Sequence, residues 1–212
     1  MNPACGAMPD PTGPDAWDTP GPVGATPLDP DDAEGLRLGW VTTRADLNTA
    51  EQASILAAVR RPRWRRPTTR YLLDDAAVRR LHKDMLGDVW TWAGTYRRRE
   101  TSIGIAPQRI GVAVHDLVQD AGYWFDGDRP MTPDEAGWTF HHRLVSIHPF
   151  PNGNGRHARL ITDLLLRTKG QQPFTWGSND LNFPGTARTA YLTALRAADG
   201  GDYSPLSRFV RS

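Results

Sequence analysis

The twelve residues His148–Arg159, HPFPNGNGRHAR, break a long helical pattern with two prolines, two glycines and two asparagines. A residue that precedes proline is pushed away from the helical region, so Pro149 is expected to end the incoming helix near Ile147. His148 then lies at the mouth of the break, where its imidazole can face a cleft. The break therefore places a titratable side chain between two helices.

The second half of the stretch has the features of an anion site. Gly153 and Gly155 carry no Cβ, so the backbone can approach a ligand closely where the next helix begins. The N–H groups of a first helical turn have no partner within the helix, and the helix dipole favours negative charge there. Arg156 and Arg159 are three residues apart and therefore share one side of this helix. Two guanidinium groups beside a helix N-terminus suit a polyphosphate.

A histidine beside such a site predicts group transfer. Imidazole has an ordinary pKa of about 6.5 and can accept a proton at neutral pH. The loop thus combines a base with bound phosphates, and the chemistry that it indicates is phosphoryl or nucleotidyl transfer to a hydroxyl group.

Apolar residues recur at helical spacing on both sides of the loop, and strand signals are scarce. The sequence predicts an all-α fold, a helical bundle with one small β-hairpin flap around Arg97–Ile105. We predict helices over seven segments: from a cap at Asp46 to near Pro62, from a cap at Asp74 to Trp92, Ile110–Trp124, Pro133–Ile147, Gly153 to about Lys169, Thr186–Ala198 and Pro205–Val210.

The composition divides the chain into two parts. Residues 1–35 contain eight Pro and five Gly with hardly a large apolar side chain. Such a segment cannot offset the entropy of ordering, so we expect a disordered tail over 1–35 and one domain over 36–212.

Charge and cysteine content exclude several classes of protein. The net charge is +1, so no overall field attracts nucleic acid or an anionic membrane, and we expect neither as a partner. The mean hydropathy of −0.53 argues against a membrane protein. Cys5 is the only cysteine, which leaves no intrachain disulfide and no thiolate metal cluster. The N-terminus lacks the features of a secretory signal, and we expect a cytoplasmic protein.

The loop closely resembles the signature of the Fic family, HxFx[DE]GNGRxxR. The matching positions are His148, Phe150, Gly153, Asn154, Gly155, Arg156 and Arg159. The likeness extends from about Leu38 to Val210, through LHKDMLGDVWTWAGTYR upstream and YLTALRAADGGDYSPLSRFV downstream. In particular, the chain resembles the branch called mobile mystery protein B.

The resemblance implies a helical Fic domain that moves AMP from ATP onto a Ser, Thr or Tyr hydroxyl of a target protein. His148 would be the general base and Phe150 the anchor of the loop in the core. The anion pocket would be shaped by Gly153, Asn154 and Gly155, and the β- and γ-phosphates would be held by Arg156 and Arg159.

The same resemblance implies two protein partners. The target segment would be clamped through main-chain pairing by a flap that comprises Thr101, Ser102, Ile103 and Gly104. The two-gene arrangement of the branch suggests the toxin half of a toxin–antitoxin pair, restrained by a separate antitoxin-like protein.

One position departs from the signature. Asn152 stands where the pattern has Asp or Glu, and it offers Mg²⁺ or Mn²⁺ a neutral carbonyl oxygen in place of a carboxylate. Hard divalent cations favour charged oxygen ligands, so metal affinity should fall. Two alternatives therefore stay open: a Doc-like phosphotransferase, and a catalytically weak module that binds ATP and regulates a partner.

Many Fic proteins carry an inhibitory helix with the pattern [ST]xxxE[GN]. Glu34 and Gly35 could end such a pattern, but Pro30 stands where Ser or Thr is expected. Glu34 is thus a candidate inhibitory residue, and the separate inhibitor is the alternative.

Two other motifs have simpler interpretations. The spacing of His141, His142, His148 and His157 fits no usual zinc site, and His141 and His142 are interpreted as packed or surface residues. The run RRPRWRRPTTR, Arg60–Arg70, could contact nucleic acid but more often forms a solvated loop.

Overall fold

The computed structural model describes residues 33–128, 131–178, 181 and 185–212. Most of the predicted tail, residues 1–32, lies outside the described residues. Gly35 is buried against Trp92, and Leu36 forms an isolated antiparallel bridge with Trp90. The described residues thus include 33–35 of the predicted tail, and Gly35 among them is buried.

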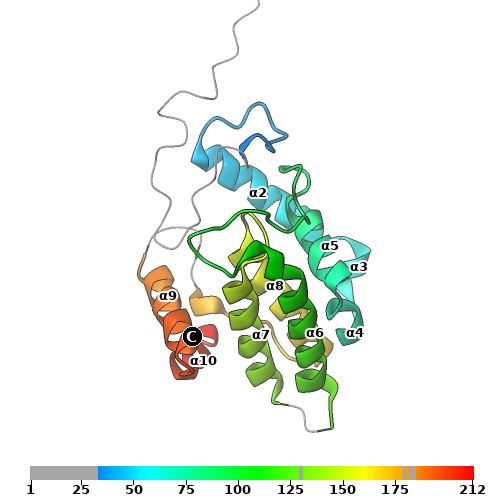
Figure 1. Ribbon diagram of the computed structural model, residues 1–212, viewed down its shortest axis with the longest axis vertical. Helices are drawn as coiled ribbons and strands as arrows, with labels where there is room; N and C mark the ends of the chain where they lie inside the picture. The colour runs from blue at the N-terminus through cyan, green and yellow to red at the C-terminus, as the bar shows by residue number, and fades with distance from the viewer. Residues whose placement is uncertain (1–32, 129–130, 179–180, 182–184) are drawn as a thin grey trace, which may run out of the picture.

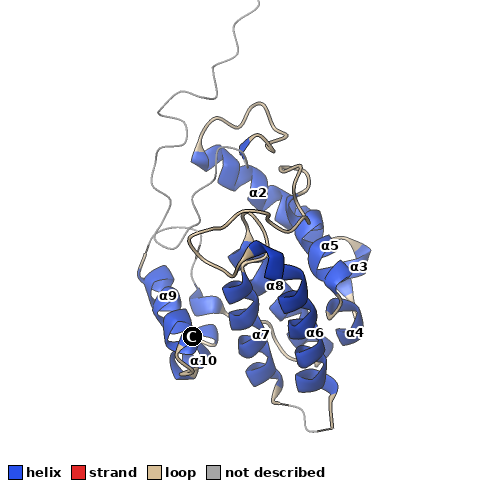
Figure 2. Ribbon diagram, viewed as in Figure 1, coloured by secondary structure: helices blue, strands red, loops and turns tan. Residues whose placement is uncertain are grey.

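The described residues form a helical domain, and each of the seven predicted segments contains a helix (Figures 1 and 2). The second helix is shorter than predicted, because it ends at Leu86 and residues 87–92 are not helical. The α-helices are α2 Arg44–Val59, α3 Pro62–Arg65, α4 Thr69–Leu72, α5 Asp75–Leu86, α6 Ile110–Asp126, α7 Pro133–Ile147, α8 Asn154–Thr168, α9 Thr186–Asp199 and α10 Ser204–Val210. Two short 3₁₀ helices, η1 Pro107–Arg109 and η2 Trp176–Ser178, complete the set.

The predicted β-hairpin flap is wrong in its secondary structure. No strand is present among the described residues, and the segment 97–105 is an irregular loop (Figure 2). Its carbonyl groups bond side chains instead of a second strand: Ile103 accepts from the Thr101 hydroxyl, and Ile105 accepts from Arg97. Because these bonds replace a ladder, sequence alternation gives no signal for them.

The ends of the helices follow from local sequence. Asp74 caps α5 as predicted, and Thr132 caps α7 in a capping box with Glu135. At α2 the cap is Thr43, not Asp46. Thr43 accepts from the Asp46 backbone N–H, and the Asp46 carboxylate accepts from the Thr43 N–H in return, so Asp46 is the third residue of the helix.

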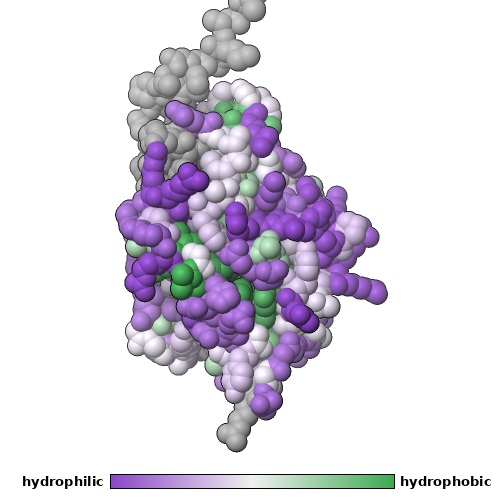
Figure 3. All heavy atoms as spheres, turned by 45° about the vertical axis from the view of Figure 1, so that its right-hand side comes forward, coloured by the Kyte–Doolittle hydropathy of each residue, from purple (hydrophilic) through white to green (hydrophobic). Residues whose placement is uncertain are grey.

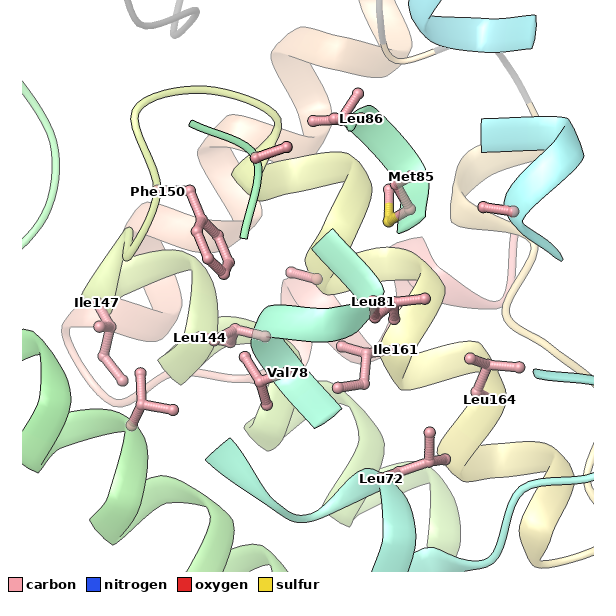
Figure 4. Close-up of a cluster of buried hydrophobic side chains, with 14 of the residues drawn as sticks. Leu72, Val78, Leu81, Met85, Leu86, Leu144, Ile147, Phe150, Ile161 and Leu164 are labelled. Atoms are coloured by element: carbon pink, nitrogen blue, oxygen red, sulfur yellow. The ribbon is translucent and has the colours of Figure 1, made fainter. Parts of the chain in front are cut away.

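The main core lies between α5, α7 and α8, with α2, α4 and α6 packed around them (Figure 4). Leu81, Leu144 and Ile161 point into this core from three different helices and are almost completely buried. Burying one such side chain contributes about 1.5–3 kcal/mol, so these contacts fix the two helices that flank the loop.

A second, smaller hydrophobic cluster joins the C-terminal helices. It contains Trp176, Tyr191, Leu206 and Val210, and it borders the main core through Leu166 of α8. In Figure 1, α9 and α10 lie to one side of α7. α9 packs chiefly on α10, and α10 packs on α7.

The surface is largely hydrophilic on the face shown in Figure 3. Part of the arginine run is nevertheless structural: Trp64 is buried and donates to the Asp84 carboxylate at 2.8 Å, and Arg61 pairs with the same carboxylate at 2.7 Å. Within the described residues, no helix has both the length and the apolar character that crossing a membrane requires.

Candidate active site

The loop between α7 and α8 turns through two residues of positive φ. His148 ends α7 in the left-handed conformation, with φ 53° and ψ 61°, and Gly153 precedes α8 with φ 78°. A left-handed histidine is uncommon, because its Cβ crowds the backbone. The loop must therefore be held by contacts that over-determine this shape.

Asn154 supplies one set of these contacts. Its side-chain oxygen accepts from the Phe150 N–H at 2.9 Å, and its amide nitrogen donates to the Phe150 carbonyl at 2.7 Å. Both polar ends of this buried side chain thus bind the loop itself. Asn154, which we expected to shape the anion pocket, braces the loop and lines the cavity.

Gly153 is required by the core beneath the loop. A Cβ at this position would come within 2.5 Å of Leu86 Cδ1, in addition to the strain of the positive φ. For Gly155, the second residue of α8, the only atom within 4 Å of such a Cβ is Arg159 Nη1 at 3.6 Å. The first glycine lets the loop approach α5, and the second leaves space toward the cavity.

Phe150, the expected anchor, is fully buried and stacks on His82 of α5 with ring centroids 3.7 Å apart. His82 Nδ1 accepts from the Gly94 N–H at 3.0 Å, so Nε2 carries the proton and donates to the Asn152 carbonyl at 3.0 Å. Burial, above all, lowers the pKa of His82 well below its ordinary value. A neutral histidine therefore ties the loop to α5.

His148 opens into a cavity of about 450 Å³. Its walls come from α2, α7, the loop, the start of α8 and one face of α9. Of the predicted site residues, His148, Asn152, Gly153, Asn154, Gly155, Arg156 and Arg159 all line it. The flap contributes Ile103 and Gly104, while Thr101 and Ser102 are not among the lining residues.

Arg156 forms an ion pair with a carboxylate that lies outside the motifs of the sequence. Its guanidinium lies 2.7 Å from Glu51 Oε2 of α2, and Glu51 Oε1 accepts from the Trp90 indole N–H at 2.7 Å. The side chain of Glu51 is 2% exposed. A buried carboxylate needs such partners, so Glu51 is held firmly against the predicted phosphate site.

Arg159 is held by a hydroxyl group of α9. The Tyr191 hydroxyl of α9 accepts a hydrogen bond from Arg159 and lies 2.8 Å from His141 Nε2. Since the arginine can only donate, the hydroxyl proton points to His141. Burial lowers the pKa of Arg159 most strongly, and the positive charge of Arg156 lowers it further. Arg188 and Arg196 of α9 also line the cavity, so both α8 and α9 contribute guanidinium groups to it.

The surroundings of His148 keep its imidazole uncharged. Burial lowers its pKa to about 4, with a further contribution from the positive charge of Arg97, while a hydrogen bond to the Val145 carbonyl works in the opposite direction. The ring is therefore neutral at physiological pH. A neutral imidazole can accept a proton without first losing one.

The buried histidines make the stability of the fold depend on pH. Burial lowers the pKa of His141 to about 3 and of His148 and His157 to about 4, whereas Asp163 is raised to about 6 by burial. Below a pH of about 6.5, histidines in the unfolded chain bind protons, whereas the buried histidines of the folded chain stay neutral. The free energy of unfolding therefore falls as pH falls. Asp163 acts in the opposite direction and offsets part of the loss.

From these four groups we expect the free energy of unfolding to be lower by about 4 kcal/mol at pH 5 than at pH 7. Urea unfolding followed by tryptophan fluorescence at the two pH values measures the difference. Equal stability at both pH values would contradict the burial of these neutral rings.

Asn152 is a poor metal ligand in this arrangement. Its side-chain oxygen accepts from the Gly153 N–H at 2.5 Å and is engaged within the loop. Among the described residues, no group of three or more His, Cys, Asp or Glu side chains could hold a metal ion. The residues of the loop therefore do not fit a divalent cation by themselves.

Other predicted candidates lie apart from the cavity or have structural partners. Glu34 is exposed and is not among the lining residues, in contrast to Glu51. His142 binds Asp199 and Tyr203, at 2.8 and 3.0 Å. These contacts place His142 at the α7–α9 edge of the cavity.

Comparisons with known proteins agree with this geometry. Residues 72–166 match the model of the Fic/DOC family. Protein adenylyltransferase fic-1 of Caenorhabditis elegans is 29% identical over 145 residues, which cover 65% of this chain and 26% of the relative. Protein adenylyltransferase Fic of Drosophila melanogaster is 33% identical over 135 residues, 61% of this chain and 26% of the relative. The chain thus spans about a quarter of the length of these curated relatives.

Solved structures share the fold. A structure of Fic-1 from C. elegans superposes with a TM-score of 0.55 at 25% identity, covering 80% of this chain and 48% of that one. BepC from Bartonella tribocorum, solved with bound AMPPNP, gives a TM-score of 0.60 at 17% identity over 81% of this chain and 87% of that one.

The helical fold places the arginine-bearing loop and the start of α8 at one cavity. The match over residues 72–166 shows that this segment is similar to the Fic/DOC family. The structure places His148, Arg156 and Arg159 of the family signature in one cavity.

Proposed function

We propose that the protein is an adenylyltransferase that moves AMP from ATP to a Ser, Thr or Tyr hydroxyl of a target protein. One observation carries the proposal: a neutral, buried imidazole and two helix-borne guanidinium groups line the same cavity. The relatives named protein adenylyltransferase support it, although each is matched over only a quarter of its length.

The chemistry follows from the positions of the groups. The triphosphate binds the N–H groups at the start of α8 together with Arg156 and Arg159. His148 takes the proton of the target hydroxyl as its oxygen forms a bond to the α-phosphorus. The bond from that phosphorus to the β-phosphate bridging oxygen breaks, and pyrophosphate leaves. The arginines stabilise the charge that develops on the leaving group.

The position of the radioactive label in ATP tests this function directly. We expect label from the α-phosphate, but not from the γ-phosphate, to enter a protein band. Transfer of γ-label would instead support the Doc-like phosphotransferase. Tight ATP binding without transfer, with either Mg²⁺ or Mn²⁺, would support the regulatory module.

A divalent cation enters this proposal as a companion of the nucleotide. Because Asn152 is engaged with Gly153, the cation would depend on phosphate oxygens for most of its ligands. When bound, it would neutralise phosphate charge. The residues of this chain would still orient the nucleotide and accept the proton.

Replacing Asn152 by Asp is expected to strengthen the metal site. A carboxylate adds a charged oxygen ligand, so we expect Mn²⁺ affinity in the presence of AMPPNP to rise by about tenfold and transfer to become faster. Electron paramagnetic resonance of free Mn²⁺ measures the affinity independently of activity. Unchanged affinity and rate would show that position 152 limits neither.

Restraint in cis is part of the proposal. The Glu51 carboxylate is paired with the Arg156 guanidinium, so the β- or γ-phosphate of ATP must compete with this carboxylate for Arg156. This contact makes Glu51 a stronger candidate for an inhibitory residue than Glu34. It also reduces the need for a separate antitoxin-like protein, which stays an alternative source of inhibition.

A further inference from the structure

Arg97 binds the catalytic loop and the flap with one side chain. Arg97 as a whole residue is only 5% exposed. Its guanidinium group carries five N–H donors, and such donors need acceptors when they are buried. Nε donates to the His148 carbonyl at 2.7 Å, Nη1 to the Arg99 carbonyl at 2.8 Å, and Nη2 to the Ile105 carbonyl at 2.5 Å. The first carbonyl belongs to the loop, and the other two belong to the flap.

Two backbone hydrogen bonds also connect the flap to the end of α7 and the loop. The Arg97 N–H donates to the Pro149 carbonyl at 2.9 Å, and the Ile105 N–H donates to the Ile147 carbonyl at 3.4 Å. The flap, segment 97–105, is thus attached at both ends to the three residues where α7 ends and the loop begins.

The end of α7 requires such a partner. The last carbonyl groups of a helix have no donor within the helix, and a cation is favourable there because of the helix dipole. The carbonyls of Ile147 and His148 are two of these groups, and Arg97 donates to both, at 3.4 and 2.7 Å. The same contact holds His148 in its left-handed conformation.

Gly104 shows how little space separates the flap from this contact. Its φ is +114°, and a Cβ would lie 2.6 Å from Arg97 Nη2 and 2.7 Å from His148 Cβ. The flap therefore touches the base and its positioning group at once. A shift of either segment displaces the other.

We propose that Arg97 is a positioning residue that couples the flap to His148, so that a target segment seated on the flap and the base that deprotonates its hydroxyl are aligned together. This inference rests on the proposed function for its catalytic part. The structural coupling between the two segments is independent of that function.

The substitution Arg97→Lys tests whether the hydrogen-bonding geometry of Arg97 matters in addition to its charge. It keeps the positive charge but cannot reach three divergent carbonyls with the planar fork of arginine. Arg97→Lys is expected to lower kcat/KM for the target by about 100-fold, because misplacing reacting groups by an ångström has an effect of this size. The affinity for ATP is expected to stay within about twofold, since Arg97 contacts no phosphate-binding residue directly.

The matched control is Arg80→Lys of α5, because Arg80 is exposed and lies outside both the flap and the cavity lining. It is expected to leave both quantities unchanged. A loss of ATP affinity and of target turnover by the same factor in Arg97→Lys would indicate general damage and overturn the positioning role. Wild-type turnover in Arg97→Lys would do the same.

Hydrogen exchange measures the coupling without catalysis. In the wild type, the amides of Arg97 and Ile105 are expected to share one opening free energy. In Arg97→Lys, peptides covering 99–105 and 145–150 should both exchange faster, and in Arg80→Lys neither should. Faster exchange in only one of the two segments would overturn the coupling.

Gly104→Ala provides a second route if Arg97→Lys does not fold. Its added methyl group pushes on Arg97 and His148 without changing the guanidinium, and both peptides are expected to loosen. Gly111→Ala of α6 is its control, because a Cβ there meets nothing within 4 Å. Coupled exchange in a wild type without transferase activity would refute the proposed function and leave the coupling intact.

Discussion

Glu51→Gln is expected to raise the rate of AMP transfer by roughly tenfold or more, the size of a typical coupling between sites. Glutamine has nearly the same shape as glutamate, and its oxygen can still accept from the Trp90 indole. It removes the charge that pairs with Arg156 at 2.7 Å. The guanidinium then becomes available to the phosphates, so the affinity for ATP should rise together with the rate.

Steady-state transfer of α-label and calorimetric titration of ATP measure these two effects. Glu34→Gln is the matched control, because Glu34 is exposed and lies outside the cavity lining. Its rate should equal that of the wild type. If Glu34→Gln were activated and Glu51→Gln were not, the inhibitory role would move to Glu34 and the cis restraint by Glu51 would be refuted.

His148→Ala is expected to lower the transfer rate by about 10³-fold, which is within the usual contribution of a general base. The imidazole is already neutral at pH 7, because burial lowers its pKa to about 4, so its removal takes away the proton acceptor and no charge. Binding of ATP should therefore stay close to that of the wild type. Label transfer and calorimetry again separate the two.

His115→Ala of α6, an exposed position, is the control for His148→Ala. Its transfer rate should match that of the wild type. Persistent labelling in His148→Ala would refute the role of the imidazole. Loss of ATP binding in the same variant would show that the side chain holds the loop instead of accepting a proton.

The helices could be predicted from the sequence because their signals are local. Apolar spacing and the caps Asp74 and Thr132 are read from a few consecutive residues. The flap could not, because its shape is set by the guanidinium of Arg97 and the end of α7, some fifty residues away. The cap of α2 was misplaced because Thr43 and Asp46 bond each other, and either could fill the role from sequence alone.

The loop residues of the site could be predicted for the same reason, since the signature is contiguous. Glu51, Tyr191 and Arg188 could not, because the packing of α2 and α9 brings them to the cavity. Glu51 did leave one signal. It shares the buried face of α2 with Leu47, Ala50, Ser54 and Ala58, and a glutamate at such a position needs a partner.

The division of the interior into two hydrophobic clusters has a consequence for the cavity wall. The loop and Glu51 rest on the main cluster, whereas Tyr191 and Arg188 belong to a helix that rests mainly on α10. Because the two clusters are separate, a movement of α9 and α10 relative to α7 would shift Tyr191 and Arg188 at the cavity wall and leave the residues packed beneath the imidazole in place.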